Sequence, residues 1–221
     1  TNILRGLNLL HWNIWLSYIS DLADWFPLIV YMTLDQQKRR SYHLLGAYLF
    51  INSILKTSTF IILNVVLVNT LPVYHVLALS EFFFLFLFFS QALGWQKWKW
   101  LVVFVIISLN IGNTIFLQPV HEFNSYSWAA NSLVLVAMGL FVLYRIYVDM
   151  EDVSLHHYPL FIVTSAVLIY LAGSLFTYIL GSDILSKEAK SVFHNAWIIR
   201  SISDIVKSIL LLAGLWVLKR N

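Results

Sequence analysis

The chain has 221 residues, of which 60% are hydrophobic and only 11% are charged, and it contains no cysteine. With a mean hydropathy of +0.77, this composition is typical of polytopic membrane proteins, and the lack of cysteine excludes disulfide and thiolate chemistry. The net charge of +3 is no sign of a nucleic-acid partner, because membrane orientation already explains where the basic residues lie.

Apolar segments follow one another along nearly the whole chain, each close to the ~20 residues that cross a bilayer as a helix. Seven can be drawn, at 11–34, 42–67, 73–93, 100–117, 127–147, 160–180 and 194–217. Helices are expected because lipid leaves each backbone polar group to find a partner within its own segment. We therefore predict an all-α membrane protein, a seven-transmembrane-helix bundle that forms a single integral-membrane domain over 1–221.

Basic residues are divided unequally between the two sets of loops. One side holds Lys38, Arg39, Arg40, Lys97, Lys99, Arg145, Lys219 and Arg220, whereas the other holds Arg5, Lys187 and Lys190. Loops rich in Lys and Arg stay in the cytoplasm. The distribution predicts an N-terminus outside and a C-terminus in the cytoplasm.

Ionisable residues lie deep inside four of the segments. At ~1.5 Å per residue they share one central layer, about 15–22 Å from the cytoplasmic ends, with the last of the set a little higher. The layer consists of Asp21, Asp24, Lys56, Glu81, Lys207, Asp204 and Arg200. Unpaired, seven charges would cost on the order of 20 kcal/mol, so they must pair or lose their charge. We predict that Asp204 pairs with Arg200, and that Lys56 and Lys207 pair with Asp21, Asp24 or Glu81.

Uncharged polar residues are expected in the same layer: Asn110, Asn131 and Tyr170. Pro27 denies the carbonyl of Ala23 its hydrogen-bond donor, which predicts a bend beside Asp24. Two interpretations of the layer stay open. It is either a structural network that fixes helix register or a site for a ligand, ion or proton.

Four histidines map to the outer boundary of the predicted bundle: His11, His75, His121 and His194. They come from different helices and a loop, so convergence on a metal ion or a role as a pH sensor is one interpretation. Their spacing matches no metal-ligand motif, and imidazole is also common at membrane interfaces.

Five stretches resemble a family of small bacterial seven-helix membrane proteins, often encoded beside sensor histidine kinases and response regulators. They are YISDLADWFPLIV (18–30), YHVLALSEFFFLFLFF (74–89), EFNSYSWAANSLVLV (122–136), PLFIVTSAVLIYLAGSLF (159–176) and IIRSISDIVKSILLLAGLW (198–216). The resemblance implies a multi-pass protein of the bacterial inner membrane in a signalling context, with no catalytic residues to carry over. Its recurrent polar sites correspond to Asp21, His75, Glu81, Asn124, Tyr170, Gly173 and Lys207. Asn131 and Ser174 replace a carboxylate and an amide that the family often has.

Three functions are the main candidates compatible with these features, and an intramembrane lipid enzyme is a further alternative. The first is a non-enzymatic sensor or accessory subunit, surrounded by lipid and partnered by another membrane protein, a sensor kinase or a second copy of itself. The second is a small carrier for protons, ions or a metabolite. The third is a retinal-binding protein with Lys207 as the attachment lysine. Neither of the first two requires a cofactor.

Overall fold

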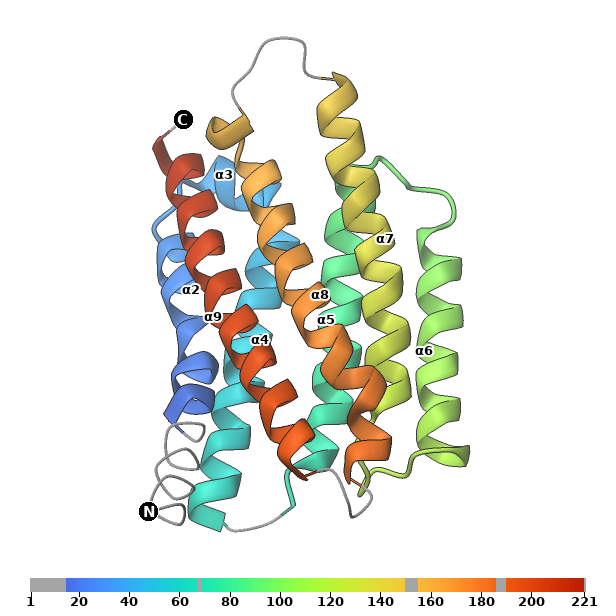
Figure 1. The fold of residues 1–221 in the computed structure, drawn as a ribbon. Helices are drawn as coiled ribbons and strands as arrows, with labels where there is room; N and C mark the ends of the chain where they lie inside the picture. The colour runs from blue at the N-terminus through green and yellow to red at the C-terminus, as the bar shows by residue number, and fades with distance from the viewer. Residues whose placement is uncertain (1–14, 67–68, 150–154, 186–189, 221) are drawn as a thin grey trace.

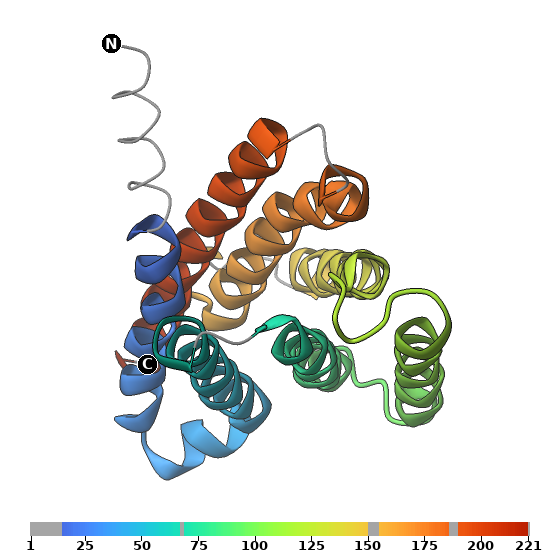
Figure 2. The same ribbon diagram turned by 90° about the horizontal axis from the view of Figure 1, so that it is seen from below.

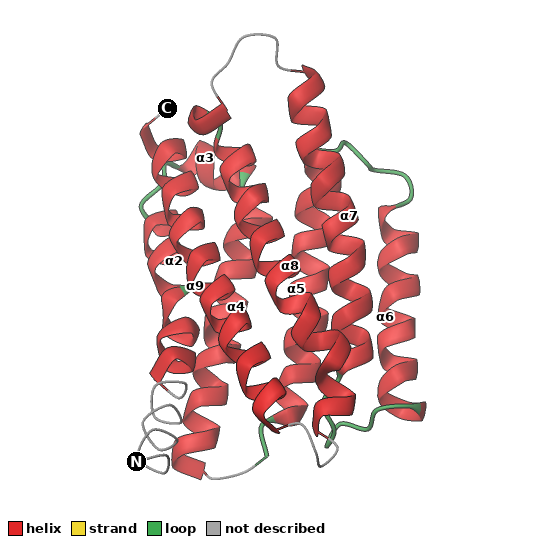
Figure 3. Ribbon diagram, in the orientation of Figure 1, coloured by secondary structure: helices red, strands yellow, loops and turns green. Residues whose placement is uncertain are grey.

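The computed structural model describes residues 15–66, 69–149, 155–185 and 190–220, which are mostly helical and contain no strand (Figures 1 and 3). A helical stretch at 15–23 precedes α2 (Trp25–Met32), and the short α3 (Gln36–Ser41) leads into α4 (His43–Ile61) with its π-helical extension η1 (Ile62–Val66). The remaining elements are α5 (Leu71–Ala92), α6 (Lys99–Phe116), α7 (Ser125–Asp149), the 3₁₀ turn η2 (Leu155–His157), α8 (Pro159–Leu185) and α9 (Lys190–Arg220).

Among the described residues, six helices are long and apolar enough to cross a membrane: His43–Ile61, Leu71–Ala92, Lys99–Phe116, Ser125–Asp149, Pro159–Ile179 and Trp197–Arg220. They coincide with six of the seven predicted segments, so the chain is an integral multi-pass membrane protein. The first predicted segment is described from residue 15 on, and a turn at Asp24 divides this part into two short helical stretches. Pro27 explains the turn, since it offers no N–H to the carbonyl of Ala23.

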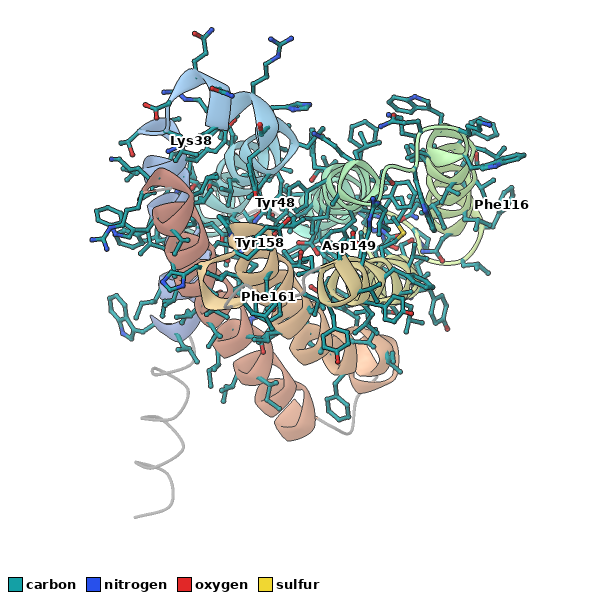
Figure 4. All side chains as sticks on the ribbon, turned by 90° about the horizontal axis from the view of Figure 1, so that it is seen from above. Lys38, Tyr48, Phe116, Asp149, Tyr158 and Phe161 are labelled. Atoms are coloured by element: carbon teal, nitrogen blue, oxygen red, sulfur yellow. The ribbon has the colours of Figure 1, made fainter. Side chains whose placement is uncertain are left out.

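The helices form a ring of six in which each packs against two neighbours (Figure 2). The order around the ring is α2, α4, α5, α7, α8 and α9, and α9 closes it against α2. Helix α6 lies outside the ring and packs on α5 and α7. In Figure 4 Tyr48 points into the ring, where it is buried, while Phe116 lies on the outside of α6 and is 81% exposed.

The outer surface of this ring is apolar over most of its height. On α6 the exposed side chains include Phe104, Leu109 and Phe116. A continuous apolar surface of this kind fits contact with lipid chains better than contact with water.

The end of the bundle that carries the C-terminus, called the upper end here, gathers the basic loops (Figure 1). Lys38 Nζ donates to the Lys219 carbonyl at 3.0 Å, and Lys219 Nζ donates to Thr33 Oγ1 at 3.0 Å. Arg145 Nη1 donates to the Leu93 carbonyl at 2.6 Å. All eight basic residues predicted for the cytoplasmic side belong to segments at this end.

Close packing of α8 on α9 gives a first prediction. A Cβ at Gly173 would overlap Ser203 Oγ and Cβ, whereas a Cβ at Gly112 would meet nothing within 4 Å. We expect Gly173→Ala to lower the thermal unfolding temperature in detergent, because overpacking costs about 1–3 kcal/mol. Adding Ser203→Gly should restore part of the loss, and Gly112→Ala is the control that should leave stability unchanged or raised. An unfolding temperature unaltered by Gly173→Ala would contradict the α8–α9 contact.

Candidate functional site

Four charged side chains meet inside the ring and are called the charge quartet here: Asp24, Lys56, Asp204 and Lys207. Asp24 lies at the turn before α2, Lys56 on α4, and the other two on α9. None of the four is more than 4% exposed. The quartet therefore joins three helices that come from opposite ends of the sequence.

Each ammonium group of the quartet contacts both carboxylates. Lys56 Nζ lies 2.8 Å from Asp24 Oδ2 and 2.5 Å from Asp204 Oδ2. Lys207 Nζ lies 2.6 Å from Asp204 Oδ1 and 3.2 Å from Asp24 Oδ1. Two positive and two negative charges cancel, which is the condition under which buried ions are tolerated.

Neutral donors and acceptors complete the hydrogen bonding of the quartet. Asp24 accepts from Asn52 Nδ2 at 2.6 Å and from Ser208 Oγ at 2.6 Å. Asp204 accepts from Ser20 Oγ at 2.7 Å, and Lys207 donates to Tyr48 Oη at 3.2 Å. These bonds fill lone pairs that the ammonium groups leave open, so the quartet is hydrogen-bonded as well as neutral.

A chain of hydrogen bonds connects Glu81 to Arg200 through two tyrosines and is called the tyrosine bridge here. Tyr170 Oη donates to Glu81 Oε2 at 3.1 Å and lies 3.3 Å from Tyr178 Oη, which accepts from Arg200 Nε at 3.2 Å. Lys207 Nζ lies 4.4 Å from the centre of the Tyr170 ring. The bridge thus touches the quartet at one point and ends at a separate cation.

Arg200 itself is surrounded by aromatic rings, a group called the arginine cage here. Its Cζ lies 4.5 Å from the Trp197 ring, 5.7 Å from the Tyr178 ring, and 6.0 Å from each of Tyr74 and Trp128. The residue is 9% exposed. Cation–π contact stabilises a desolvated guanidinium but supplies no hydrogen-bond acceptor.

The predicted pairing is partly confirmed. Lys56 and Lys207 pair with Asp24 as predicted, but the pairing of Asp204 with Arg200 is wrong, because Asp204 contacts the two lysines. The two ammonium groups together neutralise both carboxylates, and Arg200 instead donates a hydrogen bond to Tyr178. Asp21 lies half-buried and forms no ion pair within the described residues.

The predicted layer is divided in two by the structure. Asn110 and Asn131 lie in a separate amide network between α5, α6 and α7, where each donates to the other at 3.0 and 3.1 Å. Asn131 also donates to the Ala78 carbonyl at 3.3 Å. These bonds hold α6 against the ring and do not reach the quartet.

Two of the four rim histidines, His75 and His121, have described side chains, and neither belongs to a group that could hold a metal ion. His75 is buried, with Nδ1 3.0 Å from Thr114 Oγ1 and Nε2 3.1 Å from the Glu122 carbonyl, and His121 is exposed. His11 and the side chain of His194 lie outside the described residues. In the part of the chain that is described, no three His, Asp or Glu side chains form a group able to hold a metal ion.

The sequence analysis missed several partners of the charges: Ser20, Tyr48, Tyr74, Tyr178, Trp197 and Ser208. Ser208 follows Asp204 by four residues and so shares its helical face, a signal that periodicity could have revealed. Tyr48 lies two turns before Lys56 on α4, which also places it near the same face. Tyr74 offered no such signal, because its partner lies on another helix.

Compared with protein-family models, with curated proteins and with solved structures, the chain has no match.

The neutrality of the quartet gives a second prediction. Lys56→Met leaves two carboxylates with one ammonium, and we expect it to lower the free energy of unfolding by about 3–5 kcal/mol. Adding Asp24→Asn restores neutrality and should recover a large part of that loss, as measured by thermal unfolding in detergent. The exposed Lys97→Met serves as the control. Simple additivity of the two single changes would contradict the quartet.

Proposed function

We propose that the chain is a non-enzymatic membrane subunit that senses a ligand or partner and passes a helix rearrangement to the upper end of the bundle. The observation that carries this proposal is the charge quartet across the break at Asp24. Both ammonium groups touch both carboxylates, so α2 or α9 can shift while each charge keeps a partner. A neutral cluster with interchangeable partners is a physical basis for two packings of similar energy.

Contacts along α9 support transmission toward the upper end. This helix carries Arg200, Asp204 and Lys207 in sequence, and its last residues contact Lys38 and Thr33 in the connection between α2 and α4. A movement of α9 at the quartet would therefore reach α3 through direct hydrogen bonds. The physical basis for coupling would be the two packings of the quartet, with α9 connecting them to the upper end.

We further propose that the upper end faces the cytoplasm of a bacterial inner membrane, where a sensor kinase, another membrane protein or a second copy receives the signal. The excess of Lys and Arg at this end supports the orientation. The family resemblance of the sequence supports the signalling context.

Distances between spin labels test whether the quartet has two packings. Because the chain contains no cysteine, labels attach only at cysteines that are introduced. Cysteines at Gln37 on α3 and Tyr147 on α7 would report the upper end. Because Asp24→Asn weakens both ammonium contacts at the break, we expect it to shift the distance distribution toward a second maximum. The pair Gln96 and Tyr147, which avoids the quartet helices, should not change.

A folded Asp24→Asn variant with the same single distance as the unmodified quartet would overturn the proposal. It would leave the quartet as a fixed structural network that sets helix register.

A carrier function is the second candidate, and the helix break at Asp24 favours it. Transporters often bind substrates where a helix is interrupted near the middle of the membrane. Asp21, half-buried one turn before the break, would add a second carboxylate to such a route. Lys207 does not favour a retinal-binding role, because its ammonium already lies between two carboxylates and the Tyr48 and Tyr170 rings.

Flux through proteoliposomes distinguishes the carrier from the sensor. A carrier should acidify or alkalinise the lumen under an imposed ion gradient, and Glu81→Gln or Asp204→Asn should abolish that flux because each removes a buried charge. Lys97→Met should transport like the unmodified chain. If all four samples match empty liposomes, the carrier function is excluded for the ions tested.

A further inference from the structure

The arginine cage holds a cation whose hydrogen-bonding capacity is largely unused. Arg200 donates through Nε to Tyr178 Oη at 3.2 Å. Within the described residues its two Nη groups donate no hydrogen bond, and no carboxylate oxygen lies within 4.0 Å of the guanidinium. A guanidinium that is nine-tenths buried normally satisfies its fork with a carboxylate or phosphate.

We propose that the arginine cage is a binding site for a monocarboxylate with an apolar or aromatic body. This inference rests on the proposed function and names the class of ligand that the subunit senses. The guanidinium fork would hold the carboxylate through the Nη groups, and the rings would cover the body of the ligand.

The charges around the site favour a single negative charge over a dianion. Lys56 and Lys207 are occupied by Asp24 and Asp204, so Arg200 is the one buried cation in the described residues without a carboxylate partner. Glu81, at the far end of the tyrosine bridge, adds a negative charge of its own. A phosphate dianion would need a second cation that the described part of the site does not supply.

The aromatic walls favour an apolar body on the ligand. Trp128 and Tyr178 stack with ring centres 4.7 Å apart, and Tyr74 lies edge-on to Trp197 at 6.4 Å. Such rings offer flat apolar surfaces in addition to cation–π contact. Arg200 lies about 15 Å of helix from the lower end of α9 at Lys190 and about 30 Å from its upper end at Arg220. The ligand would therefore enter from the lower end.

Occupation of the cage would be felt at the quartet. Tyr178 Oη now accepts a hydrogen bond from Arg200 Nε. A carboxylate bound to the Nη groups would compete with Tyr178 Oη for the guanidinium. Tyr178 is bonded to Tyr170, whose ring lies against Lys207. The tyrosine bridge is thus a short path from the ligand to the quartet.

Calorimetry with the full chain in phosphatidylcholine nanodiscs tests the site. The probes are phenylacetate and hexanoate as monocarboxylates, phenylacetamide as the neutral isostere of phenylacetate, and inorganic phosphate. We expect phenylacetate to bind at least about tenfold more tightly than phenylacetamide or phosphate, and Arg200→Gln to remove that preference. Arg220→Gln is a matched control, since Arg220 also lies over a tryptophan, 5.4 Å from Trp216, but is exposed.

Equal binding of phenylacetate and phenylacetamide would overturn the inference, and this comparison needs no variant. So would tight binding of phosphate alone, or phenylacetate affinity that Arg200→Gln leaves unchanged. Arg200→Lys keeps the charge without the fork and should retain only part of the preference.

The spin-label pair at Gln37 and Tyr147 separates this inference from the proposed function. Failure of the monocarboxylates to bind, with a distance shift still produced by Asp24→Asn, removes the ligand class and leaves the sensor. Binding at Arg200 without any shift removes the sensor and leaves the site.

Discussion

The arrangement of the ring depends on the charge quartet, whose two lysines and two aspartates can be buried only together. Each charge alone would destabilise a helix in lipid by several kcal/mol, and each pair alone would leave lone pairs unfilled. The quartet meets both conditions because every ammonium contacts both carboxylates, while Asn52, Ser20 and Ser208 donate further hydrogen bonds to three of the same four oxygens. Its members lie near the start, the first quarter and the end of the chain. Ion pairs therefore hold α2, α4 and α9 together and close the ring, because hydrophobic packing between helices in lipid supplies little driving force for association.

The break at Asp24 belongs to the same constraint. Pro27 removes one helical hydrogen bond, and the chain turns at the residue whose carboxylate both lysines need. A straight helix would point Asp24 in a direction fixed by its neighbours, whereas a turn lets its two oxygens reach α4 and α9 together. The weakened backbone is offset by two ion pairs and two hydrogen bonds. The break in the helix and the ion pairs of Asp24 thus lie at the same position.

Much of the fold was predictable from the sequence, because segment length and proline position act along one dimension. Of the seven helices predicted from segment length the structure confirms six, and it also confirms the bend beside Asp24 and the burial of charges from four segments. Partner choice needs helix rotation and neighbour identity, which residue counting does not provide. Arg200 and Asp204 lie on the same stripe of one helix, yet Asp204 pairs with Lys56 from another helix. Asn110 and Asn131 have the right depth for the layer, but Asn110 belongs to α6, which lies outside the ring, and Asn131 bonds to it from α7.

The division of charge along α9 bears most directly on function. Six Asp, Glu, Lys and Arg side chains are buried in the described residues, and four of them cancel within the quartet. The other two, Glu81 and Arg200, are held apart by the hydroxyls of Tyr170 and Tyr178. Had Glu81 paired directly with Arg200, the fork would be filled and the bundle would carry two closed ionic clusters. The two charges still balance, and within the described residues their separation leaves the guanidinium without a carboxylate partner. An arginine suits an anion site at this position better than a lysine would, because its planar fork binds one carboxylate through two parallel hydrogen bonds while its face lies over Trp197.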